Sequence, residues 1–503
     1  LKPLLLLTFL LYLHVRNNSK IEEVPEGFVP ISEYKKLEAN LEYVQYELAQ
    51  LKRMIFGAKS ERFVADDSQL NLFETPNEVS NSKTEEVTYT RGKHNKEKNQ
   101  PKRSELPAHL PRKEEIIEPQ YIEEGSRRIG EEITEILEYN PANVYVRKIV
   151  RPKYALPQND GVVIAELPTL PLPKSNAGAS MLAHISVSKF IDHLPFYRQS
   201  KIFKRQQLSI AESTINGWFS GVCTLLEPLY ETLQKELLES DYLQADESPI
   251  GVQDSDKKGA LHTGYQWVYR SPIKRLVLFK YQKSRSRQAP EKMLASFTGA
   301  LQTDGYKAYA HMQTKGDIEL LACWAHARRY FEKALDSDKK RAEYVLHLIQ
   351  KLYSIERKAK EREVDNQTKQ RYRSLYAKPV LTELKMWLDD TIIEVLPKNP
   401  IGKAIAYTLN LWDKLTNYVN NGVYEIDNNM IENAIRPLAL GRKNYLFAGS
   451  HDAAQRAAMM YSFFATCKVN NVEPFEWLTD VLNRIPDHKA NKLNELLPSN
   501  WRK

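Results

Sequence analysis

Cysteine is scarce in this chain of 503 residues, which contains only Cys223, Cys323 and Cys467. Three cysteines so far apart in sequence are too few for a disulfide framework or for a four-cysteine zinc ribbon. Their scarcity favours a reducing, cytosolic environment.

Long apolar runs are equally scarce. The one such run, Leu4–Leu13, has about half of the ~20 residues that a helix needs to cross a bilayer, and no small-residue cleavage site follows it. We therefore expect no membrane residence. A secretory signal would conflict with the basic, cysteine-poor remainder, so we expect residues 1–30 to be an unassigned leader from a truncated or misplaced start.

The charge excess is small, with 72 Lys and Arg against 64 Asp and Glu and a formal net charge of +8. An excess of this size suits a polyanionic partner but is common among enzymes. With 42% hydrophobic and 27% charged residues, the composition is that of a folded protein. The length predicts several domains.

Between residues 34 and 55, apolar side chains recur at alternating spacings of three and four, the a/d rhythm of a coiled coil. They are Tyr34, Leu37, Leu41, Val44, Leu48, Leu51 and Ile55. We predict a coiled coil over residues 31–62 that forms a homodimer through residues 34–55. A lone amphipathic helix docked on the body is the alternative.

Residues 63–104 lose this periodicity and end in a basic stretch, Arg91–Arg103, with six Lys or Arg and one Glu. Such a stretch predicts a flexible basic linker, and the alternative is a segment that contacts phosphates. In residues 105–175, Pro-rich turns alternate with β-like runs such as Val144–Val150 and Val162–Ala165, which predicts a small β domain.

Helical spacing returns in residues 176–238. Two short helices, Phe196–Phe203 and Ser209–Phe219, with a polar turn between them resemble a helix-turn-helix, and an ordinary helical hairpin is the alternative. In a helix-turn-helix, the second helix would offer Glu212, Ser213 and Asn216 to a DNA major groove. Its other face, with Ile210, Ile215 and Trp218, would lie against the core.

Residues 239–335 predict an α/β fold. Strand-like runs at residues 242–246, 265–269 and 275–281 precede a helix, a strand at 300–303, a short helix, a strand at 318–322 and the helix Trp324–Leu335. The order β-β-β-α-β-α-β-α is that of a ribonuclease-H-like core. In that fold, strand one carries a carboxylate at the centre of the sheet and strand four ends beside it, and Asp246 and Asp304 stand at these two places.

Two carboxylates at neighbouring strand ends repel each other and are costly to bury without a cation. Mg²⁺ (or Mn²⁺) is a hard cation that accepts carboxylate oxygens. Two such ions ~3.5–4 Å apart promote phosphoryl transfer. The pair of aspartates therefore predicts a site for two divalent ions.

A third ligand is expected from a helix that packs on the sheet, and Glu432 is the candidate. Asn428 or Asn429 can cap this helix, which places Glu432 within about its first turn. Glu432 could instead pair with Arg436 on a surface.

The cationic residues Arg436, Arg442 and Lys443 follow Glu432 closely and suit a phosphodiester substrate. The stretch between Asp304 and Glu432 is too long for two neighbouring elements of a compact fold. We therefore predict a helical insertion over residues 336–425, the last part of the core over 426–465 and a helical tail over 466–503.

Four long blocks carry a family resemblance. They are Leu243–Pro249 (LQADESP), Leu301–Tyr309 (LQTDGYKAY), Cys323–Phe331 (CWAHARRYF) and Asp427–Asn444 (DNNMIENAIRPLALGRKN) with Leu446–Ser450 (LFAGS). In this order they resemble the catalytic blocks of the insertion sequence 66 (IS66) family of DDE transposases. The blocks Phe56–Arg62, Leu106–Pro111 and Lys189–Arg198 extend the resemblance over about residues 33–482.

The resemblance implies a DNA transposase that cuts at the terminal inverted repeats of its element and joins the freed 3′ hydroxyls to target DNA. Asp246, Asp304 and Glu432 would be the catalytic, metal-binding triad. The expected DNA contacts are Arg436, Arg442, Lys443, Arg328, Arg329, Ser213 and Asn216. The resemblance also implies a bacterial cytoplasmic location at the nucleoid and small accessory proteins encoded beside this one.

Cys323 and His326 belong to a motif that resembles one found after the last core strand of several DDE families. Two ligands cannot close a tetrahedral zinc site, so we expect a packing or hydrogen-bonding role. The family also carries a cysteine-rich zinc segment where this chain has residues 118–160, which contain no cysteine. We therefore expect no zinc there.

Two other functions stay open. One is a ribonuclease-H-like nuclease that cuts without joining. The other is a catalytically silent DNA-binding protein, although all three acidic positions are filled.

Overall fold

The computed structural model describes residues 106–502, apart from residues 107, 123, 125, 141–142, 157–160, 174, 254–259 and 316–317. The predicted leader, coiled coil and basic linker lie outside the described residues. None of the helices in the described part of the chain has the length and apolarity needed to cross a bilayer.

A four-stranded sheet follows first, in the region predicted as a small β domain. Its centre is the antiparallel pair β2 (Arg127–Asn140) and β3 (Asn143–Ala155), to which β1 (Arg112–Ile116) and β4 (Val162–Ile164) add. The strands are longer than the predicted runs because pairing continues through charged positions. There the side chains pair across strands, as in Arg151–Glu132 at 2.8 Å and Arg112–Glu135 at 3.1 Å.

Three helices connect this sheet to the next, namely α3 (Ala179–Phe190), α4 (Phe196–Arg205) and α5 (Glu212–Leu238). The polar turn between α4 and α5 lies where a helix-turn-helix was expected. However, α5 is far longer than the predicted Ser209–Phe219, because leucines continue at helical spacing and are completely buried. These leucines are Leu226, Leu229, Leu233 and Leu237.

The second sheet is mixed, six-stranded and ordered β7-β6-β5-β8-β9, with β10 (Phe447–Ala448) paired to the far end of β5. The first three strands, β5 (Tyr242–Gln253), β6 (Leu261–Ser271) and β7 (Leu276–Gln282), are antiparallel. After α6 (Gln288–Met293), the strands β8 (Gly299–Gln302) and β9 (Ile318–Leu321) run parallel to β5. A 3₁₀ helix, η3 (Lys307–Lys315), separates them, and α7 (Trp324–Glu332) follows. This is the element order predicted from the sequence, and β5 lies at the centre.

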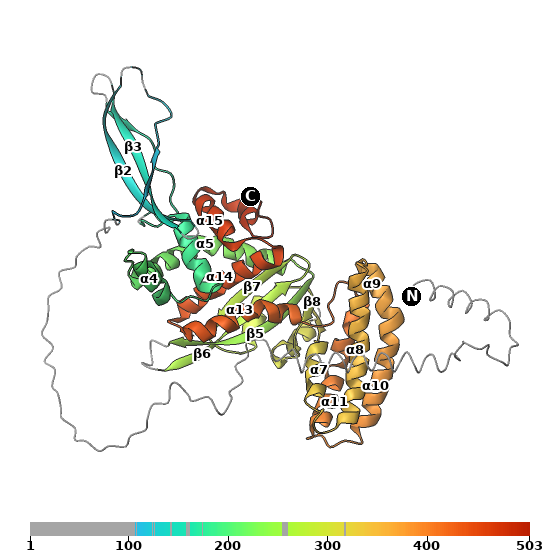
Figure 1. Ribbon diagram of the computed structural model, residues 1–503. Coiled ribbons are helices and arrows are strands. Elements are labelled where there is room, and N and C mark those ends of the chain that lie inside the picture. The colour runs from blue at the N-terminus through green and yellow to red at the C-terminus, as the bar shows by residue number, and fades with distance from the viewer. Residues whose placement is uncertain are drawn as a thin grey trace, which may run out of the picture. The chain divides into compact units, whose positions relative to one another are not determined.

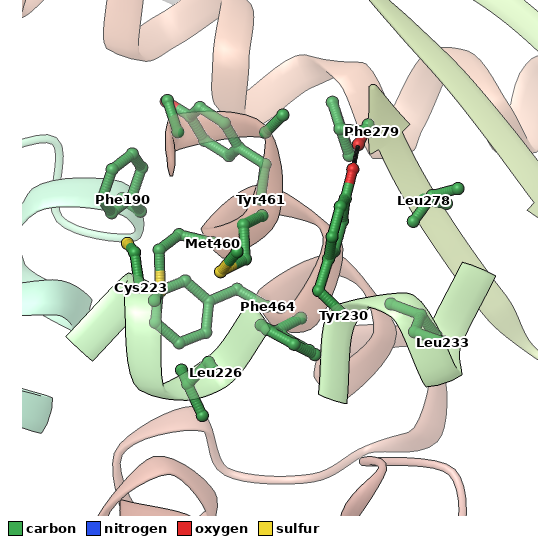
Figure 2. Packing of buried hydrophobic residues seen from close by; sticks show 14 of the residues in the cluster. Phe190, Cys223, Leu226, Tyr230, Leu233, Leu278, Phe279, Met460, Tyr461 and Phe464 are labelled. Atoms are coloured by element: carbon green, nitrogen blue, oxygen red, sulfur yellow. Dashed lines mark hydrogen bonds between the residues drawn. The ribbon is translucent and has the colours of Figure 1, made fainter. Parts of the chain in front are cut away.

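Helix α14 (His451–Asn470) covers the outer strand β7 (Figure 1). Its hydroxyls satisfy the free edge of that strand, since Ser462 accepts from the N–H of Phe279 at 2.8 Å and Thr466 accepts from the N–H of Val277 at 3.1 Å. Figure 2 shows Tyr230 of α5 directing its hydroxyl to the carbonyl of Phe279 from within the same apolar cluster. Buried edge groups are therefore paired without another strand.

The chain after α14 is helical as well. It forms α15 (Pro474–Arg484) and the 3₁₀ helices η6 (Ile485–Asp487) and η7 (Ala490–Leu496). Helix α14 runs without a break across residue 465, where a boundary between the core and the tail was expected, because its buried face continues past this position with Thr466 and Cys467.

Between α7 and α13 (Asn429–Tyr445), the regular elements are all helices, joined by turns. The elements are α8 (Lys339–Glu361), α9 (Asn366–Tyr372), the π-helical turn η4 (Arg373–Ala377), α10 (Lys378–Ile392), α11 (Pro400–Asn410), α12 (Trp412–Thr416) and η5 (Asn417–Asn420). Arg373 of η4 is fully buried and links this turn to α8 and to the chain around η5. It pairs with Glu356 at 2.7 Å and donates to the carbonyls of Tyr418, Asn421 and Tyr424. All of its donors are used, which is what makes a buried arginine tolerable.

We expect Thr466→Val to lower the free energy of unfolding by about 1–3 kcal/mol, because it keeps the side-chain volume but leaves a buried backbone N–H of β7 without its partner. Urea denaturation followed by circular dichroism measures the change. Thr382→Val is the control, since the hydroxyl of Thr382 bonds only within its own helix and is exposed. Equal effects of the two substitutions would show that the edge of β7 does not need the hydroxyl.

Candidate active site

The register of β5 and β8 brings two aspartates to the same end of the sheet. Gln244 pairs with Gln302 in the parallel ladder, and Asp246 and Asp304 each lie two residues further along. Neighbouring parallel strands point their carboxyl ends in the same direction. The sheet therefore places both aspartates at its centre, where the strand order predicted them.

Asp246 is a carboxyl group in an unfavourable setting. One of its oxygens accepts the N–H of Glu247 at 2.7 Å. In the described part of the chain no cation pairs with it. Burial is the main cause that raises the pKa of Asp246 to about 8, and the charges of Glu247, Asp304 and Glu432 contribute to the same rise. A cation at this position would remove the cost of ionising the group.

Glu247 is a fourth acidic residue in this cluster, and the sequence pattern had not singled it out. Its side chain is only 2% exposed and pairs with Arg285, whose guanidinium lies 4.0 Å from the centre of the Tyr306 ring. Burial raises the pKa of Glu247, whereas the bonds from Arg285 lower it. In the sequence, only its position next to Asp246 could have indicated that Glu247 belongs to this cluster.

Asp304 stands in a tight turn after β8. Its carboxylate accepts the N–H of Tyr306 at 2.8 Å, and Gly305 between them has φ +91°. Glycine adopts this conformation without the strain that a side chain would bring. The backbone carbonyl of Asp304 accepts the hydroxyl of Tyr407, from α11, at 2.7 Å.

Glu432 lies in the first turn of α13 (Asn429–Tyr445), as predicted. Asn428 is the N-cap residue by position, but its side chain makes no capping bond. The carboxylate of Glu432 is held by Arg329 through two bonds of 2.9 and 2.7 Å, and Nε2 of His326 is 3.8 Å away. Because Arg329 occupies both oxygens, Glu432 is a neutralised carboxylate in this arrangement.

A buried hydrogen-bond network fixes the segment that leads into α13. The amide of Gln302 accepts the hydroxyl of Tyr242 at 2.6 Å and the amide of Gln244 at 2.8 Å, and it donates to the carbonyl of Glu425 at 2.8 Å. Gln244 in turn donates to the carbonyl of Asp427 at 3.2 Å. The strands that carry the aspartates therefore bind the backbone just before the helix that carries Glu432.

Cys323 and His326 lie at the start of α7. The thiol of Cys323 is buried and accepts the backbone N–H of Asn428 at 3.4 Å, and burial raises its pKa to about 12. Burial lowers the pKa of His326, and the charge of Arg329 lowers it further. A buried, protonated thiol that accepts a hydrogen bond fits the packing and hydrogen-bonding role expected for it.

The expected DNA contacts are differently placed. Arg436 and Lys443 are exposed on α13, and Ser213 and Asn216 are exposed at the start of α5. The other three cationic side chains have protein partners. Arg328 pairs with Glu332 at 2.9 Å, Arg442 donates to the carbonyl of Pro249, and Arg329 binds Glu432.

Within the described ranges, no three His, Cys, Asp or Glu side chains are grouped closely enough to hold a metal ion. The donor set nevertheless fits a hard divalent cation, because it offers only carboxylate oxygens and because Asp246 is buried without a compensating positive charge. The carboxylate of Glu432 is engaged in an ion pair with Arg329.

Comparison with known proteins gives a consistent result. The family profile described as "Transposase IS66 family" matches residues 174–456, "IS66 C-terminal element" matches residues 462–499, and "Transposase C of IS166 homeodomain" matches residues 44–114. The chain is 31% identical over 485 residues to the uncharacterized protein y4jD of Sinorhizobium fredii, a match that covers 91% of this chain and 94% of the relative. The uncharacterized protein y4qI of the same organism is 30% identical over 482 residues, with 90% and 88% covered.

We expect Asp246→Asn to stabilise the metal-free protein at high pH. The pKa of Asp246 is about 8 in the folded protein and 3.8 when the group is unperturbed, so between about pH 4 and pH 8 the folded state holds a proton that the unfolded state has lost. The free energy of unfolding therefore falls as the pH rises through this range. The variant lacks this loss, so its melting temperature should exceed that of the unsubstituted protein by about 2–4 °C or more at pH 8. The difference should shrink towards pH 5.

Melting curves in a chelator at pH 5, 6, 7 and 8 measure this effect, with the exposed Asp336→Asn as the control. A difference that does not change with pH would show that Asp246 titrates normally.

Proposed function

The chain belongs to the IS66 family of DDE transposases, which are polynucleotidyl transferases, and on that premise we propose that Asp246, Asp304 and Glu432 form its catalytic, metal-binding triad. The observation that supports the proposal is the electrostatic influence on Asp246, in β5, of Asp304 in the turn after β8 and of Glu432 in α13. Burial is the main cause of the raised pKa of Asp246, and the charges of both other members add to the rise. These residues lie more than fifty positions apart in sequence, so their influence on one another depends on tertiary structure.

The core in this proposal is ribonuclease-H-like, with residues 239–335 as its first part and residues 426–465 as its last part. The supporting features are the mixed sheet order β7-β6-β5-β8-β9 and the carboxylates on the central strand and its parallel neighbour. Residues 336–425 are a helical insertion between them.

A DDE transposase implies a divalent-metal catalytic site. Asp246, Asp304 and Glu432 would hold Mg²⁺ or Mn²⁺, as two ions. When bound, such ions activate an attacking oxygen and stabilise the leaving one during strand cleavage and strand transfer.

The residues of the chain have distinct tasks in this site. The β5 and β8 register holds Asp246 and Asp304 at a fixed spacing, and the ion pair between Glu247 and Arg285 keeps a neighbouring negative charge neutralised. Arg329 neutralises Glu432 in the metal-free protein, and a bound cation would compete with it for this carboxylate. If Glu432 leaves this ion pair, the guanidinium of Arg329 remains beside the site, where it suits a phosphate oxygen.

DNA is the substrate, as the transposase family implies, and terminal inverted repeats together with target DNA are the proposed sites of action. The exposed residues Ser213 and Asn216 on α5, and Arg436 and Lys443 on α13, are the proposed contacts. Two copies would pair through residues 34–55, a segment that the profile matched to residues 44–114 partly covers. Small accessory proteins are further proposed partners.

The substitutions Asp246→Asn, Asp304→Asn and Glu432→Gln each test the triad. We expect each to reduce Mg²⁺-dependent cleavage and strand transfer by at least 10³-fold, because charge stabilisation in the transition state is the main catalytic contribution. Binding to the same DNA should change by less than about threefold. The substrate is a duplex from the ends of the element that carries this gene, and the control is Asp336→Asn.

A variant of the triad that still cleaves would remove that residue from the mechanism. Cleavage by the unsubstituted protein without joining of precut ends would favour the nuclease instead. Metal-dependent DNA binding without any nicking would favour the silent DNA-binding protein.

Arg329→Gln tests whether this arginine competes with cations for Glu432. We expect it to tighten Ca²⁺ binding by about threefold to fivefold, the worth of a partly exposed ion pair. Isothermal titration calorimetry measures the change. The neighbouring Arg328→Gln is a matched control because its partner is Glu332, and weaker Ca²⁺ binding in Arg329→Gln would contradict the competition.

A further inference from the structure

We infer that the helical insertion sets the geometry of the acidic site through two tyrosine hydroxyls, those of Tyr407 on α11 and Tyr353 on α8. The inference rests on the proposed function, because it concerns the same carboxylates. Neither hydroxyl bonds to a carboxylate of the triad, so both tyrosines are positioning residues.

Tyr407 holds the turn that carries Asp304. Its hydroxyl donates to the backbone carbonyl of Asp304 at 2.7 Å. The ring stacks on Tyr330 of α7 with a centroid distance of 4.3 Å and an interplanar angle of 23°. The ring is therefore held by the core while its hydroxyl fixes the turn.

Gly305 shows how closely the insertion approaches this turn. A Cβ atom at Gly305 would lie 2.6 Å from Cδ1 of Leu411 and 3.5 Å from the hydroxyl oxygen of Tyr407. Contacts between Cβ and neighbouring atoms are not found as close as the first of these distances. The insertion thus packs against the backbone beside the second aspartate.

Tyr353 holds the segment that leads into the helix of Glu432. Its hydroxyl donates to one oxygen of Asp427 at 2.8 Å, and the other oxygen accepts the N–H of Asn429 at 3.0 Å. Asn429 is the first residue of α13, and Glu432 lies in its first turn. Asp427 therefore links a phenol of the insertion to the start of this helix.

The helical insertion that carries both tyrosines is itself hydrogen-bonded to the core. The indole N–H of Trp324 donates to the carbonyl of Leu415 at 2.8 Å, and the N–H of Ala322, just after β9, donates to the carbonyl of Lys414 at 2.9 Å. A shift of the insertion would therefore move the turn of Asp304 and the start of α13 together. Two carboxylates of the triad depend on one helical body for their relative position.

The test uses the full chain with Tyr407→Phe, Tyr353→Phe and the double variant. Tyr344→Phe is the matched control, because Tyr344 donates to the carboxylate of Glu383 at 2.9 Å within the insertion, away from the acidic site. Calorimetry with Ca²⁺ measures ion binding without catalysis, and fluorescence anisotropy measures DNA binding. Cleavage is followed as a function of the Mg²⁺ concentration.

Each single variant should weaken Ca²⁺ binding about threefold to tenfold, the effect of one lost hydrogen bond. Cleavage should need correspondingly more Mg²⁺ and recover at saturation, whereas DNA affinity and the behaviour of Tyr344→Phe stay unchanged. Ca²⁺ binding equal to that of the unsubstituted protein in both single variants, while Asp304→Asn abolishes it, would overturn the inference and leave the proposed function intact. Failure of the unsubstituted protein to bind Ca²⁺ would overturn both.

Discussion

Negative charge buried at the centre of a sheet is the constraint on which this molecule depends. Asp246 lies in the middle strand, where burial, with smaller contributions from the charges of Glu247, Asp304 and Glu432, raises its pKa to about 8. Two of the neighbouring negative charges are neutralised by arginines of the same chain, since Arg285 pairs with Glu247 and Arg329 pairs with Glu432. Asp246 is left without such a partner among the described residues, and a divalent cation is the group that would complete it.

The surrounding structure is built to hold these charges in place. The amides of Gln244 and Gln302 connect the two aspartate strands to the backbone that enters α13. Buried polar networks of this kind are costly when one member is missing and specify a single arrangement when every member is paired. The helical segment between α7 and α13 contributes a further buried contact, in which Arg373 links Glu356 of α8 to the backbone of Tyr424, shortly before α13.

Much of this architecture is visible in the sequence. The β-like runs and their order predicted the central sheet, and with it the parallel neighbours β5 and β8 that lead to Asp246 and Asp304, because strand order determines which ends are neighbours. The start of α13 was also predicted correctly, since Asn428 is its N-cap residue by position, although its side chain makes no capping bond. The long α5 was not, since a turn signal followed by one amphipathic stretch does not show where the buried face ends.

The interactions of the site's side chains lie beyond sequence patterns. Nothing in the spacing of Arg329 and Glu432, which are 103 positions apart, indicates that they form an ion pair. The burial of Glu247 and the reach of Tyr353 and Tyr407 also depend on tertiary packing. Patterns along the chain identify which residue types are present in each element, whereas the contacts between elements decide how each group is charged.

The release of protons on metal binding tests the central claim most directly. Calorimetric titration of the full chain with Mg²⁺ at pH 7, in two buffers with different ionisation enthalpies, gives the number of protons released per binding event. Because the pKa of Asp246 is raised to about 8, this carboxyl group is mostly protonated at pH 7, and binding should release close to one proton from it. Binding without proton release, or no binding at all, would contradict the account.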